Sequence, residues 1–355
     1  MMCAGISDQL SRHFIAMSVL CSWLICFIHV GFSPSESTLD WWLHELLVNG
    51  ICRIAVPFFF LSAGFFWASN ATSAVGCLRA IRKRFVTLVI PYVLWAVIYC
   101  GFRLLLNYVL AKVKHGEFAV DMSLVDVFGL KLLEMPCFFP LWFLRDLFLL
   151  IVVSSVLFLY VNTVKRFLFC TVGILVLREM ARRLGFYGLD GYIGVFCSPM
   201  GSAYFLLGAC LRREGVVFQI DKNLIWGVGI LTTIVMVWAK STACFELSRY
   251  LSYIMIPLLL AGVWMIVPVA KVSRIAIVPI GVYLLHLFVI NCMEPIVGFF
   301  DTRGMLRSCF FGYVIRGLVV VLVASLLSGM LVRLKVFRFL FGGRVPRCEI
   351  GKDLL

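Results

Sequence analysis

The sequence predicts an all-α protein, a polytopic membrane helix bundle of about ten transmembrane helices. Of its 355 residues, 63% are hydrophobic and only 14% are charged, whereas soluble domains are about 45–50% apolar. The mean hydropathy is +1.04, and apolar runs long enough to cross a bilayer recur along the chain. These observations exclude a soluble globular protein.

Ten apolar runs can each be assigned to a spanning helix, although the fifth is short for one. They occupy residues 14–32, 51–70, 85–110, 138–161, 167–177, 193–211, 224–239, 250–268, 275–298 and 310–332. The first run follows Arg12 as in a signal peptide, but no Ala-x-Ala cleavage site follows it, so we expect a retained helix. We expect one membrane domain over residues 1–341 and a short cytoplasmic tail over residues 342–355.

The distribution of Lys and Arg orients these helices. Alternate connections, starting with the N-terminus, hold 18 of these residues and the other connections hold 10. The positive-inside rule therefore predicts that both termini are cytoplasmic and that residues 33–50, which contain no Lys or Arg, lie outside. The net charge of +14 is thus topological information and does not indicate a nucleic-acid partner. We expect a multi-pass protein of the cell's inner or plasma membrane.

His29 is the candidate for proton chemistry in the first span. A helix that begins near Phe14 carries it about 22 Å along the axis, about two thirds of the way across a hydrocarbon core of about 30 Å. Either it reaches the headgroups or it faces the bundle interior as a proton-handling group. Arg53 enters the second span from the same side, so both could face one outward cavity, or Arg53 could reach the membrane surface. Pro57 and Gly64 permit a bend or close helix packing in that span.

Charged residues near the ends of other spans are further candidates. Arg145 and Asp146 lie at the outer mouth of the fourth span, about 100° apart on a helix, so at least one should face protein or water. His286, inside the ninth run, is more typical of a buried histidine that donates to a carbonyl. The first outer connection carries Glu36, Asp40 and Glu45 beside Trp41 and Trp42, which indicates an interfacial surface and most simply an aromatic anchor. Arg316 is interpreted as a cation that reaches the headgroups.

The cysteines and histidines predict no metal site. No pair of the fourteen cysteines has Cys-x-x-Cys spacing. The five histidines likewise lack the spacing of a zinc-binding helix. Most cysteines are therefore expected to be small packing residues.

Five motifs follow one another along the membrane part of the chain. They are Arg53-x-x-Val-Pro-Phe-Phe-Phe with Gly64-Phe65; Arg82-Lys83-Arg84 with Ile90-Pro91-Tyr92 and Trp95; Pro140-Leu141-Trp142-Phe143-Leu144-Arg145-Asp146; Tyr204-Phe205-Leu206-Leu207-Gly208; and Val282-Tyr283-Leu284-Leu285-His286-Leu287. In order and spacing they resemble the acyltransferase 3 family of integral membrane O-acyltransferases, over about residues 12–335. The sequence departs from the family pattern at Ser18, where the family has Arg or Lys eleven residues before the first-helix histidine.

The resemblance implies transfer of an acyl group, commonly acetyl, from cytoplasmic acyl-CoA to a hydroxyl of a cell-surface or lipid-linked glycan. His29 would be the catalytic residue, as a general base or as the group that accepts the acyl group. Acyl-CoA is a substrate, and no bound cofactor is expected. The residues expected to stabilise the acceptor or the transition state are Arg53, Trp142, Arg145, Asp146 and His286. Those expected to bind the donor phosphates are Arg79, Arg82, Lys83 and Arg84, a cluster equally typical of the inner membrane surface or an anionic-lipid contact.

Two other classes of function compete with the enzyme. A transporter or flippase of a lipid-linked or acylated envelope precursor is equally compatible with about ten spans and ionisable residues at depth. No inverted repeat relates the first five spans to the last five. An inactive scaffold of an envelope-assembly complex is favoured slightly by Ser18. Membrane lipids are expected partners in each case, and the sequence leaves the acyl group, the acceptor and the oligomeric state open.

Overall fold

The computed structural model describes residues 8–33, 39–113, 141–160, 199–214, 221–272, 278–301, 304–334 and 339–342, with isolated positions between 165 and 180. These residues form helices and short connections, and they contain no strand. Seven of the described helical segments are long and apolar enough to cross a membrane. The all-α membrane fold is thereby confirmed, while the count of about ten spans and the sides of the two termini stay predictions.

The chain divides into two compact units. Unit 1 comprises Met1–Ser62, Val217–Val336 and Val345–Leu355, and unit 2 comprises Ala63–Val216 and Phe337–Arg344. The predicted cytoplasmic tail and most of the short fifth span lie outside the described residues.

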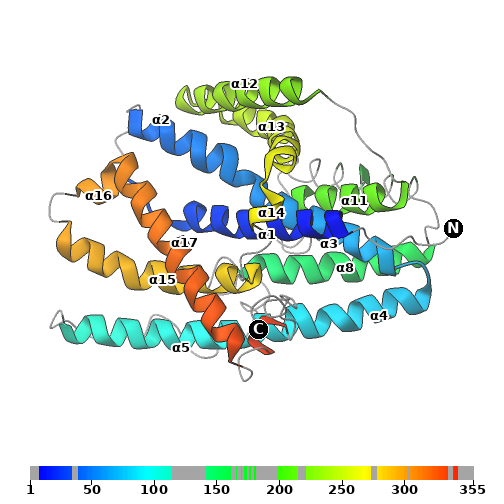
Figure 1. The fold of residues 1–355 in the computed structure, drawn as a ribbon, viewed down its shortest axis with the longest axis horizontal. Coiled ribbons are helices and arrows are strands. Elements are labelled where there is room, and N and C mark those ends of the chain that lie inside the picture. Colours follow the sequence, from blue (N-terminus) through cyan, green and yellow to red (C-terminus); the bar gives the residue numbers. More distant parts are fainter. Residues whose placement is uncertain are drawn as a thin grey trace. The chain divides into compact units, whose positions relative to one another are not determined.

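Unit 1 is built around α1. Its helices are α1 (Asp8–His29), α2 (Leu39–Glu45), η1 (Leu46–Gly50), η2 (Ile51–Ile54), the first half of α3 (Ala55–Asn70), α12 (Lys222–Ser241), α13 (Phe245–Ile266), α14 (Val269–Val272), α15 (Pro279–Phe300), α16 (Met305–Ser308) and α17 (Phe310–Arg333). Helix α1 packs against α15 and α17, and α12 lies along α13 (Figure 1). The last four predicted spans therefore occur as α12, α13, α15 and α17, close to their expected boundaries.

The second span differs from its expected form. Helical structure begins at Leu39 instead of residue 51 and passes through a π-helical turn, η1, and a 3₁₀ turn, η2, before α3. Glu45 is the last residue of α2, but helical structure continues into η1, and the Glu45 side chain is buried and forms an ion pair with Lys240 of α12. The interpretation of Glu45 as part of an interfacial surface was therefore wrong, and residues 39–50 are helical.

Unit 2 contains the remaining helices. They are the second half of α3, α4 (Ala74–Arg84), the π-helical turn η3 (Phe85–Val89), α5 (Ile90–Val113), α8 (Trp142–Tyr160) and α11 (Pro199–Glu214). Helix α8 packs against α4 and α11 (Figure 1). A Cβ atom at Gly64 would lie 1.8 Å from the carbonyl oxygen of Phe205, so α3 and α11 approach closely only because residue 64 has no side chain. The close packing predicted for Gly64 is confirmed.

Candidate active site

His29, the last residue of α1, lies beside His286 of α15. The centroids of the two imidazole rings are 5.0 Å apart and the ring planes are inclined at 40°. Because α1 and α15 pack directly against each other, regular helices hold both side chains. The two histidines that lie within predicted spans therefore form one pair, which we call the histidine pair.

His286 offers an unused hydrogen-bond acceptor in this pair. Its side chain is fully buried, and its Nδ1 is hydrogen-bonded to the carbonyl oxygen of Tyr283, as the sequence predicted. A carbonyl oxygen can only accept, so Nδ1 carries the hydrogen and Nε2 presents a lone pair. Within the described part of the chain, no hydrogen-bond partner reaches Nε2. Since a buried polar atom without a partner is costly, Nε2 is a candidate to receive a hydrogen bond from a group at the site.

Arg53 shares the neighbourhood of His29. It lies on η2, which packs against α1, and its guanidinium is close enough to His29 to interact electrostatically. The Nε of Arg53 donates a hydrogen bond of 2.9 Å to Oδ1 of Asn49, while the residue as a whole is exposed. The structure thus brings together the residues that the sequence placed at the outer ends of the first two spans.

The sequence analysis missed a polar chain behind Arg53. Asn49, which accepts from Arg53, donates through Nδ2 to Oε2 of Glu45. The same carboxylate oxygen accepts from Lys240 Nζ at 2.6 Å. The available signal was the spacing of four between Glu45, Asn49 and Arg53, since side chains four apart share a helix face. The lysine is 195 positions from the glutamate and could not be paired with it by spacing.

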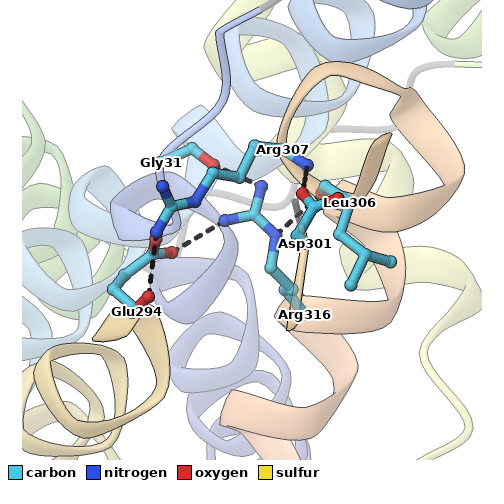
Figure 2. A network of polar contacts seen from close by, with 6 residues as sticks. All are labelled: Gly31, Glu294, Asp301, Leu306, Arg307 and Arg316. Carbon is cyan, nitrogen blue, oxygen red and sulfur yellow. Dashed lines mark hydrogen bonds and ion pairs between the residues drawn. The ribbon is translucent and has the colours of Figure 1, made fainter. Parts of the chain in front are cut away.

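A second polar network fixes the chain just after the histidine. Arg316 donates to the carbonyl oxygen of Gly31 at 2.6 Å and to Oε1 of Glu294 at 2.7 Å. Arg307 lies 3.3 Å from the other carboxylate oxygen of Glu294, as Figure 2 shows. Arg316 is only 2% exposed, so the expectation that it reaches the headgroups was wrong. The charge of Arg316 is paired inside the protein, and the same side chain binds the main chain at Gly31, two residues beyond His29.

Arg145 and Asp146 pair with each other at the start of α8. The Nη2 and Nε atoms of Arg145 lie 2.8 Å and 3.0 Å from Oδ1 of Asp146. The carboxylate is 2% exposed, which satisfies the expectation that one of these charges faces protein. The arginine side chain is long enough to reach back to its neighbour across the 100° separation. Trp142 is half-buried at the first position of the helix and its ring contacts that of Phe143 edge-on.

The predicted donor-binding cluster lies on one helix of unit 2. Arg79, Arg82, Lys83 and Arg84 all belong to α4, the last three in its final turn. The first three are exposed and the fourth is half-buried. Ser73 caps the N-terminus of this helix, because its hydroxyl accepts a hydrogen bond of 3.1 Å from the backbone amide of Gly76. The helix dipole favours cations in the last turn, so the cluster is compatible with a stable α4 whatever it binds.

The family model described as an acyltransferase domain, of the acyltransferase 3 type, matches residues 16–333. The chain belongs to the acyltransferase 3 family. The matched region includes the histidine pair, Arg53, the Arg145–Asp146 pair and the basic cluster of α4. No curated protein and no solved structure matches the chain. Family membership and the seven membrane-compatible helices together describe an integral membrane acyltransferase.

Helix α1 carries Ser18 where the resemblance to the family led us to expect a cation. The hydroxyl of Ser18 donates to the carbonyl oxygen of Phe14 at 2.7 Å. Arg12 is exposed and lies six residues earlier, about 240° around the helix. Arg12 therefore lies on a different face of α1 from Ser18.

Proposed function

We propose that this membrane acyltransferase transfers an acyl group, most simply acetyl, from cytoplasmic acyl-CoA to a hydroxyl of a cell-surface or lipid-linked glycan. The observation that carries the proposal is the histidine pair, in which a half-buried imidazole lies 5.0 Å from a second, fully buried one whose Nε2 is an unused acceptor. Imidazole is the side chain most often used to move a proton near neutral pH. We assign this pair to the proton transfer that ester formation requires.

His29 would take the proton from the acceptor hydroxyl as its oxygen attacks the thioester carbonyl. The tetrahedral intermediate then releases coenzyme A, and the proton passes from His29 to the departing sulfur. General-base catalysis of this kind contributes about 10²–10⁴-fold. In the second route His29 attacks the thioester, coenzyme A leaves as the thiol, and the hydroxyl then attacks the acyl-imidazole. Both routes yield the O-acyl ester and free coenzyme A.

His286 would hold His29 in one tautomer. With its hydrogen on Nδ1, directed at Tyr283, it can accept only through Nε2. A hydrogen bond from the nearer ring nitrogen of His29 would leave the other nitrogen of His29 without a hydrogen, ready to act on substrate. His286 is thus a positioning residue in this proposal.

Arg53 is the candidate for stabilising the oxyanion of the tetrahedral intermediate. Its guanidinium is within electrostatic reach of His29 and is always charged. A single donor to such an oxyanion is worth about 10²–10³ in rate. An anionic part of a lipid-linked acceptor would be bound by the same chemistry.

The basic cluster of α4 and the pair at α8 are assigned to substrate binding. Acyl-CoA carries several phosphates, which suit the adjacent cations Arg79, Arg82, Lys83 and Arg84. This assignment requires α4 to face the cytoplasm, as the positive-inside rule predicts. Trp142, Arg145 and Asp146 are proposed to contact the acceptor, and the pairing of the two charges suits them to a site that is only partly hydrated.

A transporter or flippase of an envelope precursor is the second candidate, favoured by the buried charges of Glu45 and Arg316. The discriminating experiment supplies the purified protein in vesicles with labelled acetyl-CoA and a lipid-linked glycan extract. Release of free coenzyme A together with label on the glycan supports the acyltransferase. Movement of the glycan across the vesicle membrane without consumption of the donor supports the transporter and contradicts the proposal.

A further inference from the structure

The irregular segment between α2 and α3, formed by η1 and η2, contacts two different helices of unit 1. The π-helical η1 packs against α12, and the 3₁₀ turn η2 packs against α1. A Cβ atom at Gly50 would lie 2.9 Å from Thr233 Cγ2 of α12, so the close approach uses the missing side chain. Single π-helical turns within longer helices occur frequently at functional sites. Here the turn lies between the helix that carries Lys240 and the helix that carries His29.

The polar chain through this segment has a fixed direction. The carboxylate of Glu45 can only accept, so it receives both Lys240 Nζ and the amide nitrogen of Asn49. The oxygen of the same amide must then face the opposite way, where it accepts from Arg53 Nε at 2.9 Å. Turning the amide over would set its NH₂ group against the guanidinium, which has no acceptor. The position of Arg53 is therefore linked to a charge pair one helix away.

The ion pair between Glu45 and Lys240 lies at the far end of this polar chain. Stability alone does not readily explain it. Glu45 is 5% exposed, and His44 Nδ1 lies 3.8 Å from its second carboxylate oxygen. The Lys240 side chain is 34% exposed, so the cost of desolvation falls mainly on the carboxylate, and replacing such a pair by apolar residues is often neutral or stabilising. An ion pair with a buried carboxylate that also orients a polar network has a use that apolar packing would not provide.

We propose that Glu45 and Lys240, acting through Asn49, are positioning residues that hold the Arg53 guanidinium beside His29 for the acyl transfer step. This inference rests on the proposed function and adds three residues to it. The Glu45–Lys240 pair fixes the side-chain amide of Asn49, and this amide fixes Nε of Arg53. The other guanidinium nitrogens are then held toward the developing oxyanion. Misplacing a catalytic group by about 1 Å can cost about 10²-fold in rate.

The decisive variant removes the pair as a unit, Glu45→Leu with Lys240→Met, so that no unpaired buried charge remains. Its matched control is Glu45→Gln with Lys240→Met, in which an amide oxygen still accepts from Asn49. Both are assayed for transfer of labelled acetyl groups and for unfolding temperature in detergent. We expect the first to lower kcat at least about tenfold with KM for the donor nearly unchanged, since a group used only in the transition state affects kcat and kcat/KM equally. The control should retain most of the wild-type kcat.

The same pair of substitutions in an Arg53→Ala background tests whether the effect passes through Arg53. If it does, replacing Glu45 and Lys240 should cause no further loss of kcat in the Arg53→Ala protein. A double-mutant cycle measures this coupling. An equal loss in both backgrounds, or no loss in either, overturns the proposal. If the leucine–methionine variant does not insert, Asn49→Leu, which cuts the link and leaves the ion pair, carries the same expectation. A wild-type protein that transfers nothing overturns the proposed function itself, and only then does the positioning role fail together with it.

Discussion

The carbonyl oxygen of Gly31 accepts a hydrogen bond of 2.6 Å from Arg316, a buried arginine 285 residues further along the chain. Gly31 follows His29 by two residues, at the point where α1 has ended and its last carbonyls have no partner within the helix. A tertiary contact therefore fixes the backbone at this end of α1. The same guanidinium binds Glu294 of α15, the helix that carries His286. Both members of the histidine pair are thus anchored through one side chain.

Replacing Arg316 by leucine is expected to destabilise the protein by about 1–3 kcal/mol, because it breaks the ion pair of a buried arginine with the half-buried Glu294 and leaves the carbonyl oxygen of Gly31 without its donor. Arg307→Leu is the control, since its side chain contacts the same Glu294 but is 44% exposed, and it should cost less than about 1 kcal/mol. The measurement is the unfolding temperature of each variant in detergent. Equal shifts for both variants would contradict the role assigned to the buried arginine.

Gly64→Ala is expected to lower the unfolding temperature strongly. The added carbon would lie 1.8 Å from a main-chain oxygen of α11, and overpacking of this kind costs about 1–3 kcal/mol or more. Gly101→Ala in α5 is the matched substitution, because nothing lies within 4 Å of its added carbon. Alanine is the better helix former by about 1 kcal/mol, so this control should be neutral or stabilising. A tolerated alanine at position 64 would show that α3 and α11 are not in close contact.

The sequence predicted the fold better than the site. Apolar runs locate α12, α13, α15 and α17 because burial in lipid demands about 20 apolar residues in each span. The helical start at Leu39 was missed because the charged residues of this segment predicted a connection outside the membrane, whereas Glu45 is buried and paired with Lys240, a partner remote in sequence. Local sequence patterns do not identify such a partner, so the ion pair between Glu45 and Lys240 could be found only from the structure.

The histidine pair shows the same limit. Depth along the first span singled out His29, and a motif singled out His286, but neither indicated that the two rings lie 5.0 Å apart. That distance is set by the packing of α1 on α15. At α8 the buried carboxylate of Asp146 confirms that one of the two neighbouring charges faces protein, and Arg145 is long enough to pair with it.

Alanine at Arg82, Lys83 and Arg84 together is expected to raise KM for acyl-CoA at least about tenfold while kcat changes little. Contacts to a remote phosphate are made equally in the ground state and the transition state, so their loss appears in KM. Lys112→Ala, at an exposed cation in the last turn of α5, is the control. Steady-state kinetics of acetyl transfer check this, after confirming that the triple variant inserts in the same orientation. An unchanged KM in that variant would leave the cluster with a topological role only.

Reporter fusions at Glu36 and at the C-terminus are expected to give opposite signals, the first outside and the second inside the cell. The reason is the excess of Lys and Arg in alternate connections, 18 against 10. Each position is tested with two reporters, one active only in the cytoplasm and one active only outside, and only one of the two should be active at each position. Matching signals from the two fusions would reverse the orientation of one end and move the basic cluster of α4 away from the cytoplasmic donor.

The central claim concerns the roles of the two histidines, and single alanine substitutions separate them. His29→Ala should lower acyl transfer by about 10²-fold or more, because it removes the general base or the acyl carrier. His286→Ala, the matched change in the facing helix, should have a smaller effect, about tenfold, because a positioning residue acts only through its partner. Neither change should prevent insertion, since removing a polar group from a membrane helix also removes a desolvation cost.

The most direct test measures labelled acetyl transfer by wild type, His29→Ala and His286→Ala at equal amounts of folded, detergent-stable protein. The account predicts almost no transfer by His29→Ala and a reduced but measurable rate for His286→Ala. Near wild-type transfer by His29→Ala would contradict it, and loss confined to His286→Ala would move the catalytic role to α15.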